Sequence, residues 1–471
     1  MGQEEVKKEL KKSGSWLLSN EIAKSTGQSL KSIQSSLRRL VKWGEVKKEP
    51  ASRVIQDPTR LKEKSFAGYA YKIKDFKTLE DLKFKDKTVL LRLDLDSRIS
   101  PEFVPTDRFS HHLPTILELI EKQAKIVILA HQSSADKKNP EKNPESLSQH
   151  SSHLSQKLNK EVKYIDDLLG ETAQNSIKSL APGDVILLKN LFSQKEEVKT
   201  KIKKQKKTKL VKTLSPLADY YINDSFSLAH KSYTSLTGFP QVMQSCIGRF
   251  FEKEIEAANH LLDPVRPCLY ILGGDKPLQL IPFIKTSLDK SRVNTIITSG
   301  FLSHIIHLAQ GKKLGGQEEE FKKLKIKVSS DIKKLSKYEN ILLPKDYKTA
   351  AMGVSEKIAL HHLPVAQHLY DIGPETVADY LELIRNAKTI VIKGPLGKVE
   401  DNIFQEATRI ILEEIEKSSA FTFVIGESTV GCFKQFNIPM KNIKHLSKNT
   451  APLLTYLTEE KLPTVEVLRT K

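Results

Sequence analysis

Short hydrophobic runs alternate with amphipathic helical segments from about residue 79 onward, and this alternation limits the possible folds more than any other feature. In a first series, strand-like runs lie at 87–96, 125–132, 160–166, 184–190 and 219–226. A second series lies at 268–274, 293–300, 388–394 and 420–426. Strands that alternate with helices are typical of a parallel sheet with helices on both faces. The pattern predicts an α/β protein with two doubly wound lobes, joined by the charged helical stretch 250–263.

One strand end carries a phosphate-binding pattern. In "ILGGDKPLQLI" (271–281) a hydrophobic strand runs into Gly273 and Gly274, and Lys276 follows. Glycines let the backbone approach a phosphate closely, and the carboxyl ends of parallel strands are where such folds bind ligands. The helix that follows carries leucines and a glutamine but no second cation. The pattern alone therefore does not decide whether this turn still supports phosphoryl transfer.

The first 75 residues form a separate unit in this interpretation. Two short helices flank a turn at Gly27, with Ser29 as the expected cap of the second helix, and two strands follow at 45–49 and 68–73. This order resembles a winged helix-turn-helix domain. The basic residues expected on the outer side of the second helix, where such domains contact nucleic acid, are Lys31, Arg38, Arg39 and Lys42. A protein-docking module and a merely solvated basic face are the alternatives.

The formal charge of +19 is unevenly distributed. Residues 1–75 carry 17 Lys and Arg against 9 Asp and Glu, and the stretch 194–213 carries 9 lysines against 2 glutamates. Such charge attracts nucleic acid or acidic partners. A solvated lysine-rich surface explains 194–213 equally well, because this stretch has no aromatic residue on which a base could stack.

Cysteine content and hydropathy exclude several classes of protein. The three cysteines are too few and too scattered for a disulfide framework or a metal cluster. No apolar run approaches the roughly 20 residues that a membrane span needs. We therefore expect a cytoplasmic protein that has no membrane partner and no protein-built metal site.

Several segments together identify a family. The segments "KTVLLRLDLDSRI", "LADYYINDSFSLAHK", "ILGGDK" and "KGPLGKVE" occur in the order and at about the spacing found in phosphoglycerate kinase, which residues 79–471 therefore resemble. The resemblance implies an N-terminal lobe at 79–249, a hinge helix at 250–264, a nucleotide lobe at 265–440 and a segment at 441–471 that returns to the first lobe. The unit at 1–75 lies outside it.

In the N-terminal lobe the resemblance implies a substrate site for 3-phosphoglycerate or another small anion. Its residues are Asp94, Asp96, Arg108, His131 and Lys231. Asp96 stands where the family has asparagine, and Lys231 where it has arginine. Phe192 replaces a further arginine, and Ser133, Ser134 and Ala135 replace a glycine-arginine-proline turn. Because each charged hydrogen bond contributes roughly 1.5–3 kcal/mol, the two lost arginines predict phosphate binding weakened on the order of 100-fold.

In the second lobe the resemblance implies a nucleotide site. Its residues are Gly273, Gly274, Lys276, Lys393, Glu400 and Thr429. Arg108 and Lys276 are the implied catalytic residues, since both correspond to cations that meet the transferred phosphoryl group. Several positions depart from the family: Leu280 replaces a lysine, Lys393 an asparagine, Ser428 the aspartate that reaches magnesium, and 449–451 ("NTA") a three-glycine turn.

Three hypotheses follow. The favoured one is a pseudoenzyme, in which a kinase fold with an eroded site serves as a regulator and the N-terminal unit provides the output by binding nucleic acid or protein. The second is a divergent active phosphoglycerate kinase that uses ATP or ADP with magnesium. The third is a basic nucleic-acid-binding or ribosome-associated protein. The sequence predicts no cofactor for the first and third, and no oligomeric state for any.

Overall fold

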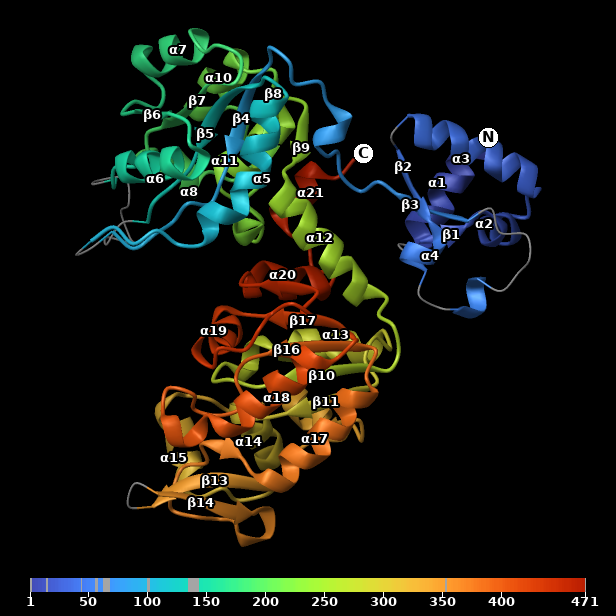
Figure 1. The fold of residues 1–471 in the computed structure, drawn as a ribbon, viewed down its shortest axis with the longest axis vertical. Coiled ribbons are helices and arrows are strands. Elements are labelled where there is room, and N and C mark those ends of the chain that lie inside the picture. Colours follow the sequence, from blue (N-terminus) through green and yellow to red (C-terminus); the bar gives the residue numbers. More distant parts are fainter. Residues whose placement is uncertain are drawn as a thin grey trace. The chain divides into compact units, whose positions relative to one another are not determined.

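The chain divides into two units in the computed structural model, which describes residues 2–13, 16–43, 45–55, 58–61, 68–99, 102–133, 144–351 and 354–470. Met1–Glu256 and Lys461–Lys471 belong to one unit, and Ala257–Glu460 form the other. The first unit contains an N-terminal module (residues 2–73) and a first lobe (79–256 with 461–470). The second unit is the second lobe (Figure 1).

A six-stranded parallel sheet is the centre of the first lobe. Its strand order is β6-β7-β5-β4-β8-β9. The strands are β4 (Thr88–Arg92), β5 (Lys125–Leu129), β6 (Val162–Ile165), β7 (Val185–Leu188), β8 (Tyr220–Asn223) and β9 (Ser245–Ile247). The helices are α5 (Arg108–Glu121), α6 (Ser148–Leu158), α7 (Glu171–Lys178), α8 (Lys195–Lys199), α9 (Ile202–Gln205), α10 (Lys209–Leu214), α11 (Thr234–Thr237) and α21 (Pro463–Leu468). The five predicted strands are confirmed, and β9 is an addition.

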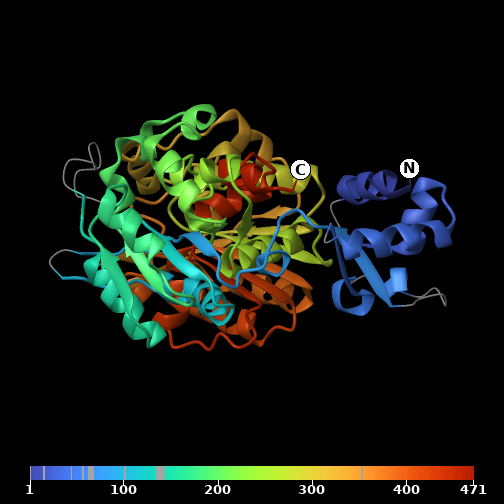
Figure 2. The ribbon, with the colours of Figure 1, turned by 90° about the horizontal axis from the view of Figure 1, so that it is seen from above.

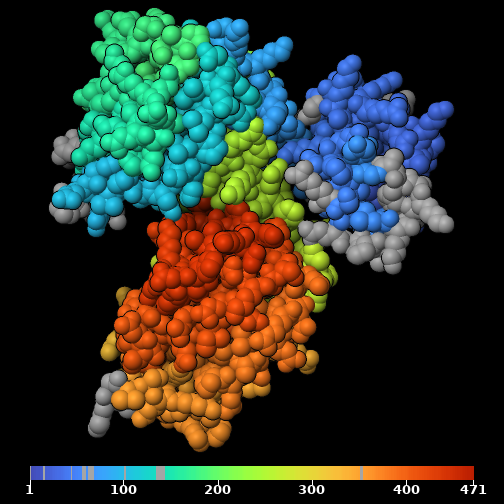
Figure 3. Space-filling model, in the orientation of Figure 1, coloured from blue at the N-terminus to red at the C-terminus, as the bar shows by residue number. Residues whose placement is uncertain are grey.

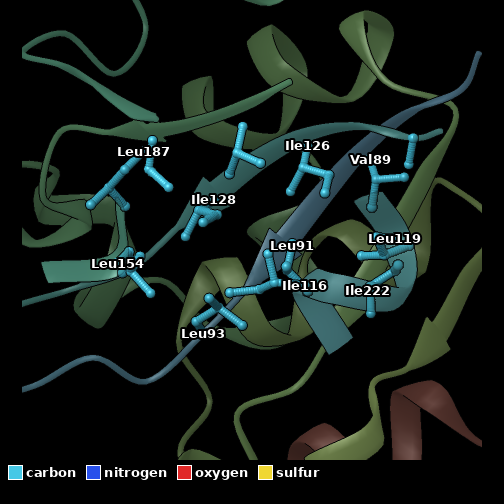
Figure 4. Packing of buried hydrophobic residues seen from close by; sticks show 14 of the residues in the cluster. Val89, Leu91, Leu93, Ile116, Leu119, Ile126, Ile128, Leu154, Leu187 and Ile222 are labelled. Atoms are coloured by element: carbon cyan, nitrogen blue, oxygen red, sulfur yellow. The ribbon is translucent and has the colours of Figure 1, made fainter. Parts of the chain in front are cut away.

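The core of this lobe explains why its strands read as continuous hydrophobic runs. Val89 and Leu91 of β4 face Ile116 of α5 and Leu154 of α6 in one buried cluster (Figure 4). Leu90 of β4, which points to the opposite face, is also fully buried. Because helices cover both faces, most strand positions are apolar and the strands show little alternation. The polar positions include Arg92, Lys163 and Asn223.

A buried carboxylate fixes the start of helix α12 (Arg249–Leu262). Asp224, at the end of β8, accepts hydrogen bonds from the backbone N–H groups of Phe250 and Phe251 at 2.9 and 3.2 Å. Thr115 and His112 of α5 bond to its other oxygen, both at 2.9 Å. Negative charge at a helix N-terminus is favourable, and the helix predicted at 250–264 is confirmed.

The second lobe has its own six-stranded parallel sheet, in the order β12-β11-β10-β16-β17-β18. The strands are β10 (Cys268–Leu272), β11 (Thr295–Thr298), β12 (Ile341–Leu342), β16 (Thr389–Lys393), β17 (Phe421–Ile425) and β18 (His445–Ser447). The helices are α13 (Ile281–Asp289), α14 (Gly300–Ala309), α15 (Gly316–Lys323), α16 (Ser330–Leu335), α17 (Pro374–Asn386), α18 (Glu406–Lys417), α19 (Glu427–Gln435) and α20 (Thr450–Leu457). In the space-filling view this unit is one continuous body (Figure 3).

Two features of the second lobe differ from expectation. A three-stranded antiparallel sheet, β14-β13-β15, was not predicted; its strands are β13 (Asp346–Ala351), β14 (Val354–Ala359) and β15 (Asp371–Ile372). β14 buries none of its residues, and β13 buries the polar Asp346 and Thr349 beside Tyr347. Neither strand therefore shows the hydrophobic run used to find strands. The returning segment begins at Lys461 and not at 441, because β18 pairs with β17 and keeps residues 441–460 in the second lobe.

The N-terminal module joins helices to a small sheet of order β1-β3-β2 (Figure 2). Its elements are α1 (Gly2–Ser13), β1 (Leu17–Leu18), α2 (Ser19–Thr26), α3 (Leu30–Lys42), β2 (Val46–Pro50), α4 (Ala51–Val54) and β3 (Tyr69–Ile73). Ser29 caps α3 by accepting a hydrogen bond from the Ser32 N–H, as predicted. The prediction missed α1, which is mostly polar and buries only Val6 and Leu10. The assignment as a winged helix-turn-helix domain stays a prediction.

The lysine-rich stretch 194–213 is an integral part of the first lobe. It folds into α8, α9 and α10, and Glu197, Gln205 and Leu210 are fully buried. All nine of its lysines are exposed. A solvated lysine face on a packed helical segment accounts for this stretch without a nucleic-acid partner, whose binding here stays a prediction. Among the described helices, none is long and apolar enough to cross a membrane.

Candidate functional site

Polar residues follow three neighbouring strands of the first lobe. Asp94 follows β4, His131 follows β5, and Ser227 lies in the turn after β8. Because β4 lies between β5 and β8 in the sheet, these residues meet at its carboxyl edge. This is where open parallel sheets bind ligands.

Asp94 and Arg108 form the central ion pair of this edge. Arg108, the first residue of α5, donates from Nη1 to Oδ1 of Asp94 at 2.9 Å, and the Ser227 hydroxyl donates to Oδ2. Burial works to raise the pKa of Asp94, but Arg108 and its other partners outweigh it, so that its pKa lies below the ordinary value. Asp94 is therefore ionised at neutral pH, while the Arg108 side chain stays 42% exposed and can donate to a ligand.

His131 is neutral and has a defined tautomer. Burial, together with the positive charge of Arg92, lowers its pKa to about 4. The Nη2 atom of Arg92 lies 2.8 Å from Nδ1 of His131. Since arginine can only donate, Nδ1 accepts and the ring proton is on Nε2. The remaining donors of fully buried Arg92 reach Ser235 and the Leu93 carbonyl, so Arg92 positions His131 from within the lobe.

Asp96 is occupied by the neighbouring loop. Its two carboxylate oxygens accept hydrogen bonds from the backbone N–H and the hydroxyl of Ser133, at 2.8 and 2.9 Å. The aspartate thereby fastens the loop after β5 to the loop after β4, and its place beside a substrate stays a prediction. Ser134 and Ala135 lie outside the described residues.

Phe192 stands where the family has an arginine, and its ring packs against other aromatic rings. Phe192 is 7% exposed, and its ring centre lies 4.4 Å from that of His131 and 5.6 Å from that of Tyr233. The position therefore offers no donor to a phosphate. Lys231 is exposed, as its predicted role requires. The motif comparison passed over Arg98, an exposed residue in the loop that leaves the carboxyl end of β4.

Glycine turns follow four adjacent strands of the second lobe. Gly274, Gly300, Gly394 and Gly426 all have positive φ, between 50° and 98°. Gly273 is constrained differently: a Cβ there would lie 2.3 Å from the Ser299 hydroxyl and 2.4 Å from the Pro395 carbonyl. The turn predicted from "ILGGDK" is thus one of several that lie side by side at the carboxyl edge of this sheet.

Replacing Gly394 by alanine is expected to destabilise the protein by roughly 2–4 kcal/mol. Its φ is +87°, and a Cβ would come within 2.3 Å of the Gly273 carbonyl oxygen. Gly311→Ala is the matched control, because Gly311 has φ +85° but no atom within 4 Å of the added Cβ. Chemical denaturation of both variants measures the difference. Equal losses would show that the approach of the two turns is not tight.

The predicted cations of this edge have different surroundings. Lys276 is exposed beside the turn, whereas Lys393, the last residue of β16, is only 8% exposed. Burial, together with the charge of Lys276, lowers the pKa of Lys393 although Asp275 opposes the shift. Leu280 is fully buried at the start of α13, so the position of the missing lysine has become part of the core.

Thr429 and Glu400 differ in their availability to a ligand. Thr429 is 1% exposed, and its hydroxyl donates to the Ile425 carbonyl and accepts from the Gly394 N–H, both at 2.8 Å. The hydroxyl therefore holds the Gly394 turn, and a direct contact of Thr429 with a nucleotide stays a prediction. Glu400 is exposed and stays a candidate.

Comparison with known proteins assigns the family. The family model for phosphoglycerate kinase matches residues 79–460. The chain belongs to the phosphoglycerate kinase family. The phosphoglycerate kinase of Methanothermus fervidus is 35% identical over 405 residues, which cover 83% of this chain and 97% of the relative. That of Methanothermobacter thermautotrophicus is 34% identical over 404 residues, with 83% and 96% covered.

Solved structures of the phosphoglycerate kinase family agree with the fold. The enzyme from Pyrococcus horikoshii is similar with a TM-score of 0.73 and 33% identity, covering 83% of this chain and 98% of that one. The enzyme from Coxiella burnetii has a TM-score of 0.71 at 27% identity, with the same coverage. Both lobes of the prediction are thereby confirmed. The family model leaves residues 1–78 outside its match.

These relatives favour the second hypothesis, a divergent phosphoglycerate kinase, over the pseudoenzyme. The family also implies ATP or ADP with magnesium, and the residues at the edge of the second lobe do not fit the metal. Magnesium is usually held by one or two carboxylates together with the substrate phosphates. The position of the expected aspartate holds the hydroxyl of Ser428, and the edge carries the buried ammonium of Lys393, which repels a divalent cation. The charge of Asp275, in the Gly274 turn, acts on this ammonium, and the described residues include no group of three or more possible metal ligands.

Proposed function

We propose that this chain transfers a phosphoryl group between ATP and 3-phosphoglycerate, more slowly than its relatives. Membership of the phosphoglycerate kinase family supports the reaction. The ion pair of Arg108 with buried Asp94, 2.9 Å long, is the structural observation that carries it, because it holds a partly exposed guanidinium at a ligand-binding edge. Phosphoryl transfer needs positioned cations and little covalent chemistry.

Each residue of the first lobe has a distinct part in this proposal. Arg108 donates to the phosphoryl group in transit, and ionised Asp94 fixes the orientation of Arg108 and accepts from a substrate hydroxyl. Neutral His131 donates from Nε2 to the substrate carboxylate. Arg98 and Lys231 add positive charge for the substrate phosphate, where Phe192 offers none.

In the second lobe, Lys276 and Lys393 neutralise the charge of the nucleotide phosphates, and the glycine turns admit those phosphates to the backbone. Glu400 is the candidate partner of the ribose. The weaker set of cations in the first lobe is the reason for the slower reaction, since each lost charged hydrogen bond costs about 1.5–3 kcal/mol.

The test is a coupled assay of the full chain with 3-phosphoglycerate and ATP, and with ADP for the reverse direction. Turnover that depends on both substrates supports the proposal. Complete absence of turnover at saturating substrate, from protein that is folded by circular dichroism, returns the pseudoenzyme hypothesis to first place.

We propose a second function for the N-terminal module, the binding of duplex nucleic acid. One observation favours it: the exposed face of α3 carries Lys31, Arg38, Arg39 and Lys42, and no ion pair joins any of the four to another described residue. The helix contains no acidic residue. Trp43, directly after it, is 58% exposed. A helix face of unpaired cations suits the phosphates of a groove.

Replacing Arg38 and Arg39 together by alanine is expected to weaken duplex binding by the full chain and to reduce the slope of log K against log salt by about 2. Fluorescence anisotropy with a labelled duplex, over a salt series, measures both. The matched control is Lys203→Ala with Lys204→Ala in the lysine-rich stretch 194–213. A larger effect of the control pair would assign binding to that stretch, and the absence of binding at low salt would end the proposal.

A further inference from the structure

A buried lysine without a partner lies at the edge of the second sheet. Lys393 is 8% exposed, and no hydrogen bond or ion pair joins it to any residue that the structure describes. Other partly buried lysines of this lobe are paired, as Lys348 is with Glu406. An isolated buried ammonium is costly, and a protein normally pairs or neutralises it. The charge of Asp275 acts on Lys393 but forms no ion pair with it, so the ammonium can still pair with an anion from outside the protein.

The surroundings of Lys393 indicate where that anion lies. Lys393 pairs in register with Leu272 of β10 and Ile425 of β17, so it is at the centre of the carboxyl edge. Ile390 and Ile392 belong to the core on one face of the sheet. By the alternation of a strand, Lys393 belongs to the other face, where Tyr270 of β10 stacks on Phe283 of α13.

Two further groups on this edge can bind an anion, the hydroxyl of Ser299 and the ammonium of Lys276. The hydroxyl of Ser299, 1% exposed, has no hydrogen-bond partner among the described residues. It lies against Gly273, whose absent Cβ leaves room for it. Lys276 is close enough to Lys393 to lower the pKa of its ammonium further. Asp275, an exposed carboxylate of the same turn, also acts on Lys393. Two cations and an unpaired hydroxyl beside glycine turns outweigh this one negative charge and form a site for a group with several negative charges, such as a polyphosphate.

We propose that the phosphates of a nucleotide bind at this edge without a metal ion, and that Lys393 supplies the positive charge that the metal would otherwise provide. The proposal rests on the nucleotide substrate proposed above, and adds that its binding is independent of magnesium. A divalent cation and the Lys393 ammonium would compete for the same phosphate oxygens. The hydroxyl of Ser428 offers the metal no charge to offset this repulsion.

The test is calorimetric titration of the full chain with ADP, once with EDTA and once with excess magnesium chloride. We expect the dissociation constants of ADP in EDTA and in magnesium to agree within about threefold. The corresponding difference in binding free energy is well below that of a tenfold change. In EDTA, Lys393→Met should weaken ADP binding by about tenfold or more, because it removes a charged hydrogen bond. Lys388→Met is the matched control, since Lys388 is exposed and precedes the amino end of the same strand; its dissociation constant should be unchanged.

Thermal unfolding of the ligand-free proteins gives a second measurement. Lys393→Met keeps the length of the side chain and removes the buried charge, so its midpoint should rise above that of the unaltered protein, whereas Lys388→Met should not shift it. Binding of ADP that needs magnesium, binding that Lys393→Met leaves intact, or no binding in either condition each overturns the proposal. Metal-independent binding without turnover in the coupled assay would reject the proposed reaction and leave this inference standing.

Discussion

Replacing Arg108 by alanine is expected to lower the turnover of phosphoryl transfer by at least about 100-fold. The Arg108 side chain is a partly exposed guanidinium at the start of α5, and a bond of 2.9 Å to Asp94 holds it at the carboxyl edge of the sheet. A donor fixed before the reaction stabilises charge in the transition state without reorganisation. The loss should therefore appear in kcat as well as in KM.

The same substitution is expected to destabilise the first lobe. Asp94 is 1% exposed, and without Arg108 its charge would retain the Ser227 hydroxyl as its direct side-chain donor. A buried charged group that loses one partner costs about 1–3 kcal/mol. Denaturant titration at neutral pH measures this loss, and circular dichroism confirms that the variant used in the assay is folded.

Two variants separate the role of Arg108 in catalysis from its role in stability. Arg108→Lys keeps the charge but loses the planar fork, so it should recover stability more fully than turnover. Lys178→Ala removes an exposed cation at the end of α7 and should change neither. If Arg108→Ala retained the kcat of the unaltered protein, the site assignment in the first lobe would be wrong.

Ionisation of Asp371 is expected to lower the free energy of unfolding by about 2–3 kcal/mol between about pH 5 and pH 8. The variant Asp371→Asn is expected to abolish this loss. Asp371 is the first residue of β15 and is 3% exposed. It accepts hydrogen bonds from the N–H groups of Ile372 at 2.9 Å and Ala407 at 3.4 Å. Burial raises the pKa of Asp371 to about 7, although these bonds and Lys348 oppose the shift.

The direction of the effect follows from proton binding. The pKa of an aspartate in the unfolded chain is about 3.9, which is lower than that of the folded protein. Between these two values the folded state binds more protons than the unfolded state, so the free energy of unfolding falls as pH rises. Asparagine stays neutral at every pH. The free energy of unfolding of the variant should therefore rise relative to that of the unaltered protein as pH increases.

The measurement is the difference in unfolding free energy between Asp371→Asn and the unaltered protein, from denaturant titrations across this pH range. Glu382→Gln removes an exposed carboxylate from α17 and serves as the matched control, with a difference that should not depend on pH. A constant difference for Asp371→Asn as well would show that this carboxyl ionises normally in the folded protein.

The parallel strands could be predicted because they are buried on both faces and therefore read as uninterrupted hydrophobic runs. The antiparallel strands β13 and β14 could not, since their pattern is polar and their partners are chosen by tertiary contacts. The polar helix α1 was missed for a similar reason: only Val6 and Leu10 of its residues enter the core of the module.

The candidate site could be predicted in outline, by residue type and position at strand ends, and its details could not. Sequence comparison placed Asp96 and Thr429 among the ligand-binding residues, whereas the structure directs their hydrogen bonds to Ser133 and Gly394. A motif gives the identity of a residue and does not show which neighbour has already satisfied its polar atoms.

The sequence by itself determined the two α/β lobes, the helix between them and the family. It also showed that Phe192 and Leu280 replace two cations of the family. These features depend on residue type and order along the chain. Only the tertiary structure decided which polar groups are paired. Burial and partners, which come from residues distant in sequence, make His131 neutral and leave Lys393 without an ion pair among the described residues. The charge states and ion pairs of the site residues in each lobe therefore depend on the fold, although the identities of these residues can be read from the sequence.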